Sequence, residues 1–149
     1  PSGLLRWQLM RESGLNPRAL GPETKSGRAM GIAQFMPGTA ADRGVDPWDI
    51  HSAIPGAADY LSELARKTGS WHGGVERYGT FSGPNGDKLR SELTALLSGA
   101  RVPEEPHGLS NRAGLAQRAR IMQALNILRA GDEDAAPEDD DPFNEAGPA

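Results

Sequence analysis

The residue best suited to chemistry in this sequence is a glutamate on the apolar side of a predicted helix. At about 100° per residue, Glu12 falls about 20° from Leu5 and about 60° from Leu9 around the helix axis. A carboxyl group in apolar surroundings has a raised pKa, because burial disfavours its charged form. Such a group can donate a proton near neutral pH. The alternative is that Glu12 lies at a frayed helix end and reaches water or pairs with an arginine, of which Arg11, Arg28 and Arg66 are candidates.

The elements that must position Glu12 are predicted to be helices. Apolar residues recur at spacings of three and four, and no stretch alternates between apolar and polar residues as a strand does. Glycines in C-cap positions close several of these segments. The predicted helices cover 4–13, 37–43, 52–68, 87–98 and 110–130, with only a weak turn at 71–78. The sequence therefore predicts an all-α fold.

Composition excludes several classes of protein. The chain has 149 residues and 37% hydrophobic residues, which suits a single globular domain. It has no cysteine, which excludes disulfides and thiolate zinc sites, and its three histidines do not have the spacing of a metal motif. No apolar run approaches the roughly 20 residues of a membrane-spanning helix. We therefore expect neither a metal nor a membrane span.

Charge is distributed unevenly along the chain. The net charge is -4, but residues 131–149 contain eight acidic residues and no basic one. Residues 1–130 therefore hold 12 acids and 16 bases. The acidic segment contains three prolines and one aromatic residue, so it buries too little apolar surface to offset the entropy of ordering. We predict a disordered tail or linker there, attached to a mildly basic body.

Two motifs in the first forty residues carry a family resemblance. The segment Glu-Ser-Gly-Leu-Asn-Pro at 12–17 is followed by Ala-Met-Gly-Ile-Ala-Gln-Phe-Met-Pro-Gly-Thr-Ala at 29–40. Together they resemble the lytic transglycosylase domain of the goose-type lysozyme superfamily. The segment Ile-Pro-Gly-Ala-Ala-Asp-Tyr-Leu-Ser-Glu-Leu at 54–64 is similar to a helix of that family. The resemblance implies a lysozyme-like fold and extends over about the first 85 residues.

The resemblance assigns roles to six residues. Glu12 would be the catalytic acid, and substrate would be bound by Ser13, Met30, Gly31, Gln34 and Tyr78. Glycine lets a backbone approach a sugar ring closely, and a glutamine amide can both donate to and accept from sugar groups. Alternatives are a helix-capping hydroxyl for Ser13 and core packing for Met30 and Phe35. Tyr60 is interpreted as a helix-packing residue.

The sequence also departs from the family pattern at two places. Lys25 and Arg28 stand where the family has serine and glycine, and Ser26-Gly27 is interpreted as the same turn shifted along the chain. Gly79-Thr80 follows Tyr78 where the family has Asn-Ala. The second departure removes an amide that would face the substrate.

The implied reaction is cleavage of the β-linkage between N-acetylmuramic acid and N-acetylglucosamine in peptidoglycan. Glu12 would protonate the leaving oxygen and then deprotonate the muramyl 6-hydroxyl, so that an anhydro ring closes. No cofactor is required. Ordinary glycosidases need a second carboxylate, and the other candidates lie on polar faces or at caps: Asp42, Asp46, Asp49, Asp59, Glu63 and Glu76. Asp46, which precedes Pro47, is interpreted as a helix N-cap.

The predicted organisation is a catalytic domain at 1–100, a Pro-rich connection and packing helix at 101–130, and the acidic tail at 131–149. In the last helix Ile121, Leu125 and Leu128 form one apolar stripe. Its arginines (Arg112, Arg118, Arg120 and Arg129) do not form a one-sided cluster with stacking aromatics, so a nucleic-acid partner is not expected.

The motif spelling and the Pro1 start favour a fragment of a phage virion protein that acts in the bacterial periplasm and cell wall. Its partners would be peptidoglycan strands and, through the C-terminal segment, other virion proteins. Two alternatives remain open at this point. One is a virion assembly module that has lost catalysis, and the other is a muramidase that hydrolyses the same bond.

Overall fold

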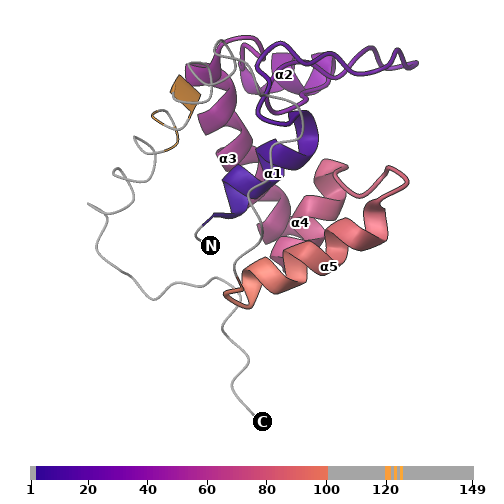
Figure 1. The fold of residues 1–149 in the computed structure, drawn as a ribbon. Helices are drawn as coiled ribbons and strands as arrows, with labels where there is room; N and C mark the ends of the chain where they lie inside the picture. Colours follow the sequence, from indigo (N-terminus) through magenta and orange to yellow (C-terminus); the bar gives the residue numbers. More distant parts are fainter. Residues whose placement is uncertain (1–2, 101–119, 122, 124, 126–149) are drawn as a thin grey trace.

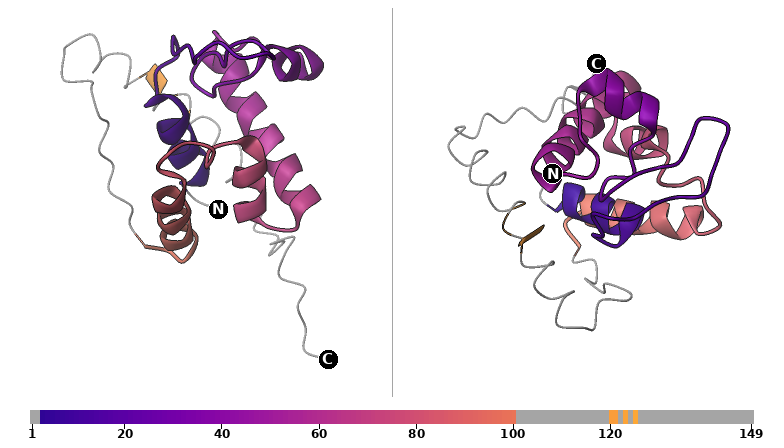
Figure 2. Two further views of the ribbon diagram at one scale, coloured as in Figure 1. Left: turned by 90° about the vertical axis from the view of Figure 1, so that its right-hand side faces the viewer. Right: turned by 90° about the horizontal axis from the view of Figure 1, so that it is seen from above.

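The computed structural model describes residues 3–100, 120, 121, 123 and 125, and five helices are defined within them (Figure 1). They are α1 (Leu4–Ser13), α2 (Pro37–Arg43), α3 (Ile50–Thr68), α4 (Trp71–Tyr78) and α5 (Gly86–Leu97). Helix α2 lies near one end of α3, and α4 and α5 lie near the other end (Figures 1 and 2). The described residues contain isolated β-bridges but no strand, which confirms the predicted all-α class.

The predicted starts and ends of the helices hold with small corrections. Helices α1 and α2 have the predicted bounds, and Gly14 and Gly44 adopt the left-handed C-cap conformation. Helix α3 begins two residues earlier than predicted, because Asp49 is its N-cap and accepts a hydrogen bond from the His51 amide. The assignment of Asp46 as the N-cap was wrong, since its carboxylate instead accepts from the Trp48 amide at 2.9 Å within the preceding turn. Helix α5 begins and ends one residue earlier than predicted.

The weak turn predicted at 71–78 is in fact a helix, α4. The Ser70 hydroxyl caps it by accepting from the Gly73 amide at 2.9 Å. Gly74 lies so close to α3 that a Cβ atom there would be 2.8 Å from the Ala65 nitrogen. Two adjacent glycines lower the intrinsic helix propensity of this segment. Its helical state therefore depends on close packing against α3, which local sequence does not reveal.

Helix α1 belongs to both apolar clusters of the structure. Leu9 is fully buried in a cluster with the loop around Ile32 and the first half of α3. Leu4 and Trp7 are buried in a second cluster, with α4, α5 and Phe81. This double packing fixes the end of α1, and hence Glu12, relative to all the surrounding elements.

The predicted helix 110–130 lies mostly outside the described residues. Positions 120, 121, 123 and 125 are helical. Ile121 is fully buried in the cluster around Leu9, and Leu125 packs against it. The apolar stripe is thus confirmed at these two positions. The predicted Pro-rich connection at 101–108 and the acidic tail at 131–149 lie outside the described residues. No described helix combines the length and apolarity needed to cross a membrane.

The loop between α1 and α2 is held in shape by backbone hydrogen bonds. Thr24 and Gly27 exchange two of them at 3.0 Å, so a tight turn includes Ser26 and Gly27. That it is the family's turn shifted along the chain stays a prediction. The Gly31 amide donates to the Ala19 carbonyl at 2.8 Å. Gly31 has φ 75°, and a Cβ atom there would lie 1.8 Å from the Pro47 carbonyl oxygen. Glycine is therefore required at this position by the approach of Pro47, and a sugar contact at Gly31 stays a prediction.

We predict that Gly31→Ala lowers the free energy of unfolding by about 3 kcal/mol or more, because backbone overlap adds to the cost of a left-handed alanine. Gly44→Ala is the matched control, since Gly44 has φ 63° and no atom within 4 Å of the added Cβ. It should cost only about 1 to 2 kcal/mol. Urea denaturation measures both, and equal losses would contradict the role given to Pro47.

Candidate active site

Glu12 lies in the last turn of α1, and one of its oxygens is held by two side chains. The Thr80 hydroxyl donates to Glu12 Oε1 at 2.6 Å, and Gln8 Nε2 donates to the same oxygen at 3.2 Å. Gln8 Nε2 also contacts Thr80 Oγ1 at 2.6 Å. Among the described residues no lysine or arginine pairs with Glu12, and Arg11 instead pairs with Glu92 at 2.7 Å. The alternative in which an arginine neutralises Glu12 is therefore wrong.

Burial raises the pKa of the Glu12 carboxyl from 4.5 to about 7, and the hydrogen bond from Thr80 partly opposes this increase. The direction agrees with the position of Glu12 on the apolar face of α1. A carboxyl group with this pKa exists in both protonation states near neutral pH. It can therefore donate a proton and then accept one without a large free-energy cost in either direction.

Two hydroxyl groups fasten the loop after Gly31 to the helices beside Glu12. Ser13 Oγ donates to the Ile32 carbonyl at 2.7 Å. The Tyr78 hydroxyl donates to the Ala33 carbonyl at 2.9 Å. The end of α1, the end of α4 and the loop at 32–33 are thereby held together. Ser13 and Tyr78 are brought to the same region as predicted, and both hydroxyl protons have partners within the protein.

Three aromatic rings pack beside the site. Tyr78 lies with its ring centroid 5.2 Å from that of Tyr60 and 6.4 Å from that of Phe35. The pKa of Tyr78 is raised, first by burial and then by the charge of Glu12, so the two groups are close enough to interact. Phe35 is a buried core residue, as the core interpretation predicts. Tyr60 carries the Arg43 guanidinium over its ring at 4.5 Å.

The two other predicted substrate contacts are placed differently. Gln34 has φ 51°, and its side-chain nitrogen donates to the carbonyls of Gly31 at 2.9 Å and Ala19 at 3.2 Å. Both of its donors hold the loop, so only its carbonyl oxygen is left for a substrate. Met30 is partly exposed and is not among the buried core residues, which corrects its core interpretation. Substrate binding by Met30 and Gln34 stays a prediction.

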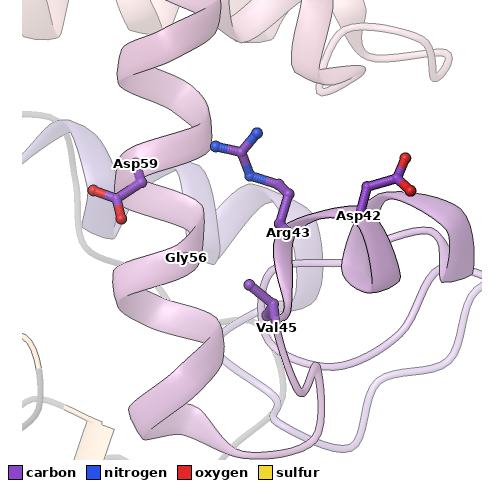
Figure 3. A pocket seen from close by; sticks show the side chains of 5 residues that line it. All are labelled: Asp42, Arg43, Val45, Gly56 and Asp59. Atoms are coloured by element: carbon purple, nitrogen blue, oxygen red, sulfur yellow. The ribbon is translucent and has the colours of Figure 1, made fainter.

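Among the described residues, none of the other carboxylates shares a hydrogen bond or an ion pair with Glu12. Glu63 pairs with Arg43 and Lys67, and these contacts lower its pKa to about 2. Glu76 pairs with Arg90. Asp42 and Asp59 line a groove of about 250 Å³ between α2 and α3, together with Arg43, Val45 and Gly56 (Figure 3). Glu12 is not among the residues that line it. In the part of the chain described here, no cluster of histidine and acidic side chains could hold a metal ion.

Sequence reasoning missed Gln8 and Thr80. Gln8 is fully buried and lies one helical turn before Glu12, so the i, i+4 spacing could have identified it. Thr80 was noted only as a departure from the family pattern that removes an amide. The structure shows that this departure also places a hydroxyl group directly on Glu12. No local signal reveals that contact, because 68 residues separate the two positions.

A comparison with known protein families finds one match that includes these residues. Residues 3–93, more than half of the chain, match the family described as Transglycosylase SLT domain. The chain belongs to this family. The match covers Glu12, the loop at 29–36 and Thr80, and it ends within α5. Membership of the SLT domain family supports the all-α lysozyme-like fold and peptidoglycan cleavage of the lytic transglycosylase type. No match was found among curated proteins or among solved structures.

The burial of Glu12 predicts how the stability of this SLT domain depends on pH. The folded-state pKa of about 7 exceeds the ordinary value of 4.5, so the folded state binds more protons between these two values. The free energy of unfolding should therefore fall as pH rises from about 4.5 to 7, and should then level off.

We predict that Glu12→Gln removes most of this dependence. Relative to wild type, the variant should gain about 2 kcal/mol of stability between pH 4 and pH 8, since a neutral amide needs no proton. Urea denaturation at pH 4, 6 and 8 measures the difference. Parallel pH profiles for the two proteins would show that the carboxyl is not buried as described.

Proposed function

We propose that this SLT domain cleaves peptidoglycan by the non-hydrolytic route, with Glu12 as the single acid and base. One observation carries the proposal: Glu12 is a half-buried carboxyl held by the neutral side chains of Gln8 and Thr80, and partial burial raises its pKa to about 7 with no contribution from another acid of the described residues. The other carboxylates for which contacts are described serve in ion pairs, in the N-cap of α3 or in the turn before it. A mechanism that needs only one carboxylate fits this arrangement better than one that needs two.

The reaction takes place in two steps. Glu12 donates its proton to the oxygen that bridges N-acetylmuramic acid and N-acetylglucosamine, and the bond from that oxygen to the muramyl C1 breaks. The neighbouring N-acetyl oxygen supports the electron-poor C1. The ionised Glu12 then takes the proton of the muramyl 6-hydroxyl, the O6–C1 bond forms and the N-acetyl oxygen leaves. The anhydro product forms without water, and Glu12 regains its proton.

Ser13 and Tyr78 are proposed to support this reaction by position. Their hydroxyl groups fasten the loop at 32–33 to the two helix ends beside Glu12. A carboxylate that must reach two different oxygens in turn needs a fixed position, because displacements of about 1 Å cost catalysis heavily. Met30 and the carbonyl oxygen of Gln34 are proposed to contact the sugar chain from the same loop.

We further propose that the chain acts on the bacterial wall as part of a phage particle. The segment Gly-Ile-Ala-Gln-Phe-Met-Pro at 31–37, whose spelling resembles phage-borne members of the family, supports this setting. Flanking tail or ejection-protein sequence in the genome would support it further. Flanking genes of bacterial wall metabolism would contradict it.

We predict that Glu12→Gln abolishes the release of muropeptides from purified sacculi, with a loss of at least about 100-fold, because no proton can be donated. Glu76→Gln is the matched control, since Glu76 is an exposed helical glutamate paired with Arg90, and it should keep wild-type activity. Release that persists in Glu12→Gln would remove Glu12 from the reaction.

The products distinguish the two remaining alternatives. Mass spectrometry of the released muropeptides should show anhydromuramic ends, which are lighter than reducing ends by one water. Reducing ends alone would identify a muramidase. Wild-type protein that releases nothing in any buffer would identify an assembly module on the same fold.

A further inference from the structure

The two hydrogen bonds that Glu12 accepts go to the same oxygen. Thr80 Oγ1 lies 2.6 Å and Gln8 Nε2 lies 3.2 Å from Oε1. Hydrogen bonds to one oxygen of a carboxyl group stabilise it as an acceptor and thus disfavour a proton on it. When Glu12 is protonated, its proton therefore belongs on Oε2.

This arrangement suits a group that must lose and regain a proton. With the proton on Oε2, Oε1 is a carbonyl oxygen and accepts both hydrogen bonds. After Oε2 has given up its proton, Oε1 is a carboxylate oxygen and accepts the same two bonds. Neither Gln8 nor Thr80 has to rotate between the two states, so the network does not add a reorganisation cost to either step.

We propose that Gln8 and Thr80 form a clamp on Oε1 of Glu12 that reserves Oε2 for proton transfer to and from the substrate. The clamp rests on the proposed function of Glu12 and makes Gln8 and Thr80 positioning residues. Thr80 follows Gly79, which ends α4 with φ 107°, so the turn after α4 carries this hydroxyl to α1. Gln8 reaches both partners from within α1 itself.

The glutamine at position 8 lowers the stability of the fold, so its presence needs another explanation. It is fully buried among apolar residues of α1, and its carbonyl oxygen has no hydrogen-bond partner among the described residues. An unsatisfied buried carbonyl is destabilising, and an apolar side chain of the same shape avoids that penalty. A glutamine at this position is explained by what its nitrogen does for Glu12 and Thr80.

The ionisable groups around the clamp come from all five of the described helices. Tyr78 of α4 interacts electrostatically with Glu12, and Tyr60 of α3 and Arg43 of α2 act on Tyr78 in turn. On the α5 side, Arg11 and Glu92 neutralise each other at 2.7 Å. None of these groups donates a hydrogen bond to Glu12 in the described part of the chain. Removing the Thr80 hydroxyl should therefore change the pKa of Glu12 itself.

The first test compares Thr80→Val with Thr80→Ser. Valine has nearly the shape of threonine but no hydroxyl, so the pKa of Glu12 should rise by about one pH unit as the carboxylate loses a donor. The carboxyl resonance of isotopically labelled Glu12, followed by NMR against pH, measures this without any substrate. On sacculi, Thr80→Val should lower kcat about tenfold or more and move the alkaline limb of the pH–rate profile upward. Thr80→Ser keeps the hydroxyl group, so the pKa of Glu12, kcat and the pH–rate profile should stay close to those of wild type.

The second test uses Gln8→Met, which keeps the volume and removes the amide. It should lower kcat about tenfold. Its free energy of unfolding should be equal to or above that of wild type, since an unsatisfied carbonyl disappears. Thr68→Val is the control, because it removes a hydroxyl that serves only backbone carbonyls near the end of α3. It should leave kcat and the pH profile unchanged.

The outcomes separate the clamp from the proposed reaction. Wild-type kcat, pH profile and Glu12 titration in both Thr80→Val and Gln8→Met would overturn the clamp, even if Glu12→Gln is inactive. An upward shift of the Glu12 titration in Thr80→Val, together with wild-type protein that releases no muropeptide, would support the hydrogen-bonding geometry and overturn the reaction. A loss of kcat in Gln8→Met that only matches a loss of folded protein would also overturn the clamp.

Discussion

The whole arrangement depends on keeping one carboxyl group half-buried at the edge of an apolar core without an ion pair to the described residues. Burial alone would keep Glu12 protonated, and a lysine or arginine beside it would keep it ionised. The structure avoids both extremes, because burial raises its pKa to about 7 while the Thr80 hydroxyl limits the increase. Neutral donors hold the carboxyl in place and leave both protonation states accessible. A single group can then serve as acid and as base.

The two apolar clusters explain why such a group can be placed accurately. Helix α1 is packed on one side through Leu9 and on the other through Leu4 and Trp7, so its last turn has little freedom to move. The loop beside it is fixed by Gly31 against Pro47 and by the hydroxyls of Ser13 and Tyr78 on adjacent carbonyls. Residues expected to bind sugar thus also build the framework around Glu12. The same loop can therefore stabilise the fold around Glu12 and contact the substrate.

The effect of the departures from the family pattern can be understood only from the contacts made in the folded structure. Gly79-Thr80 differs from the expected Asn-Ala, and from sequence the change indicates only a lost amide. In the structure Gly79 closes α4 and Thr80 reaches Glu12, with Gln8 as a buried third member. Gly31 shows the opposite case. A glycine was expected there for contact with a sugar, and the structure adds a second reason, because a Cβ atom would overlap the Pro47 carbonyl.

The sequence by itself determined the all-α class, the bounds of α1 and α2 and the position of Glu12 on an apolar face. These depend on helical periodicity and on glycine caps, which are local properties. Only the tertiary structure decided that α4 is a helix, that Asp49 rather than Asp46 caps α3, and that Thr80 and Gln8 hold Glu12. The Asp49 cap and the Gln8 contact join positions only two and four residues apart. The helical state of α4 and the Thr80 contact depend on groups that packing brings together, and 68 residues separate Thr80 from the carboxyl it contacts. No period or motif encodes such a contact, because its stability comes from a shared interior and not from neighbours along the chain.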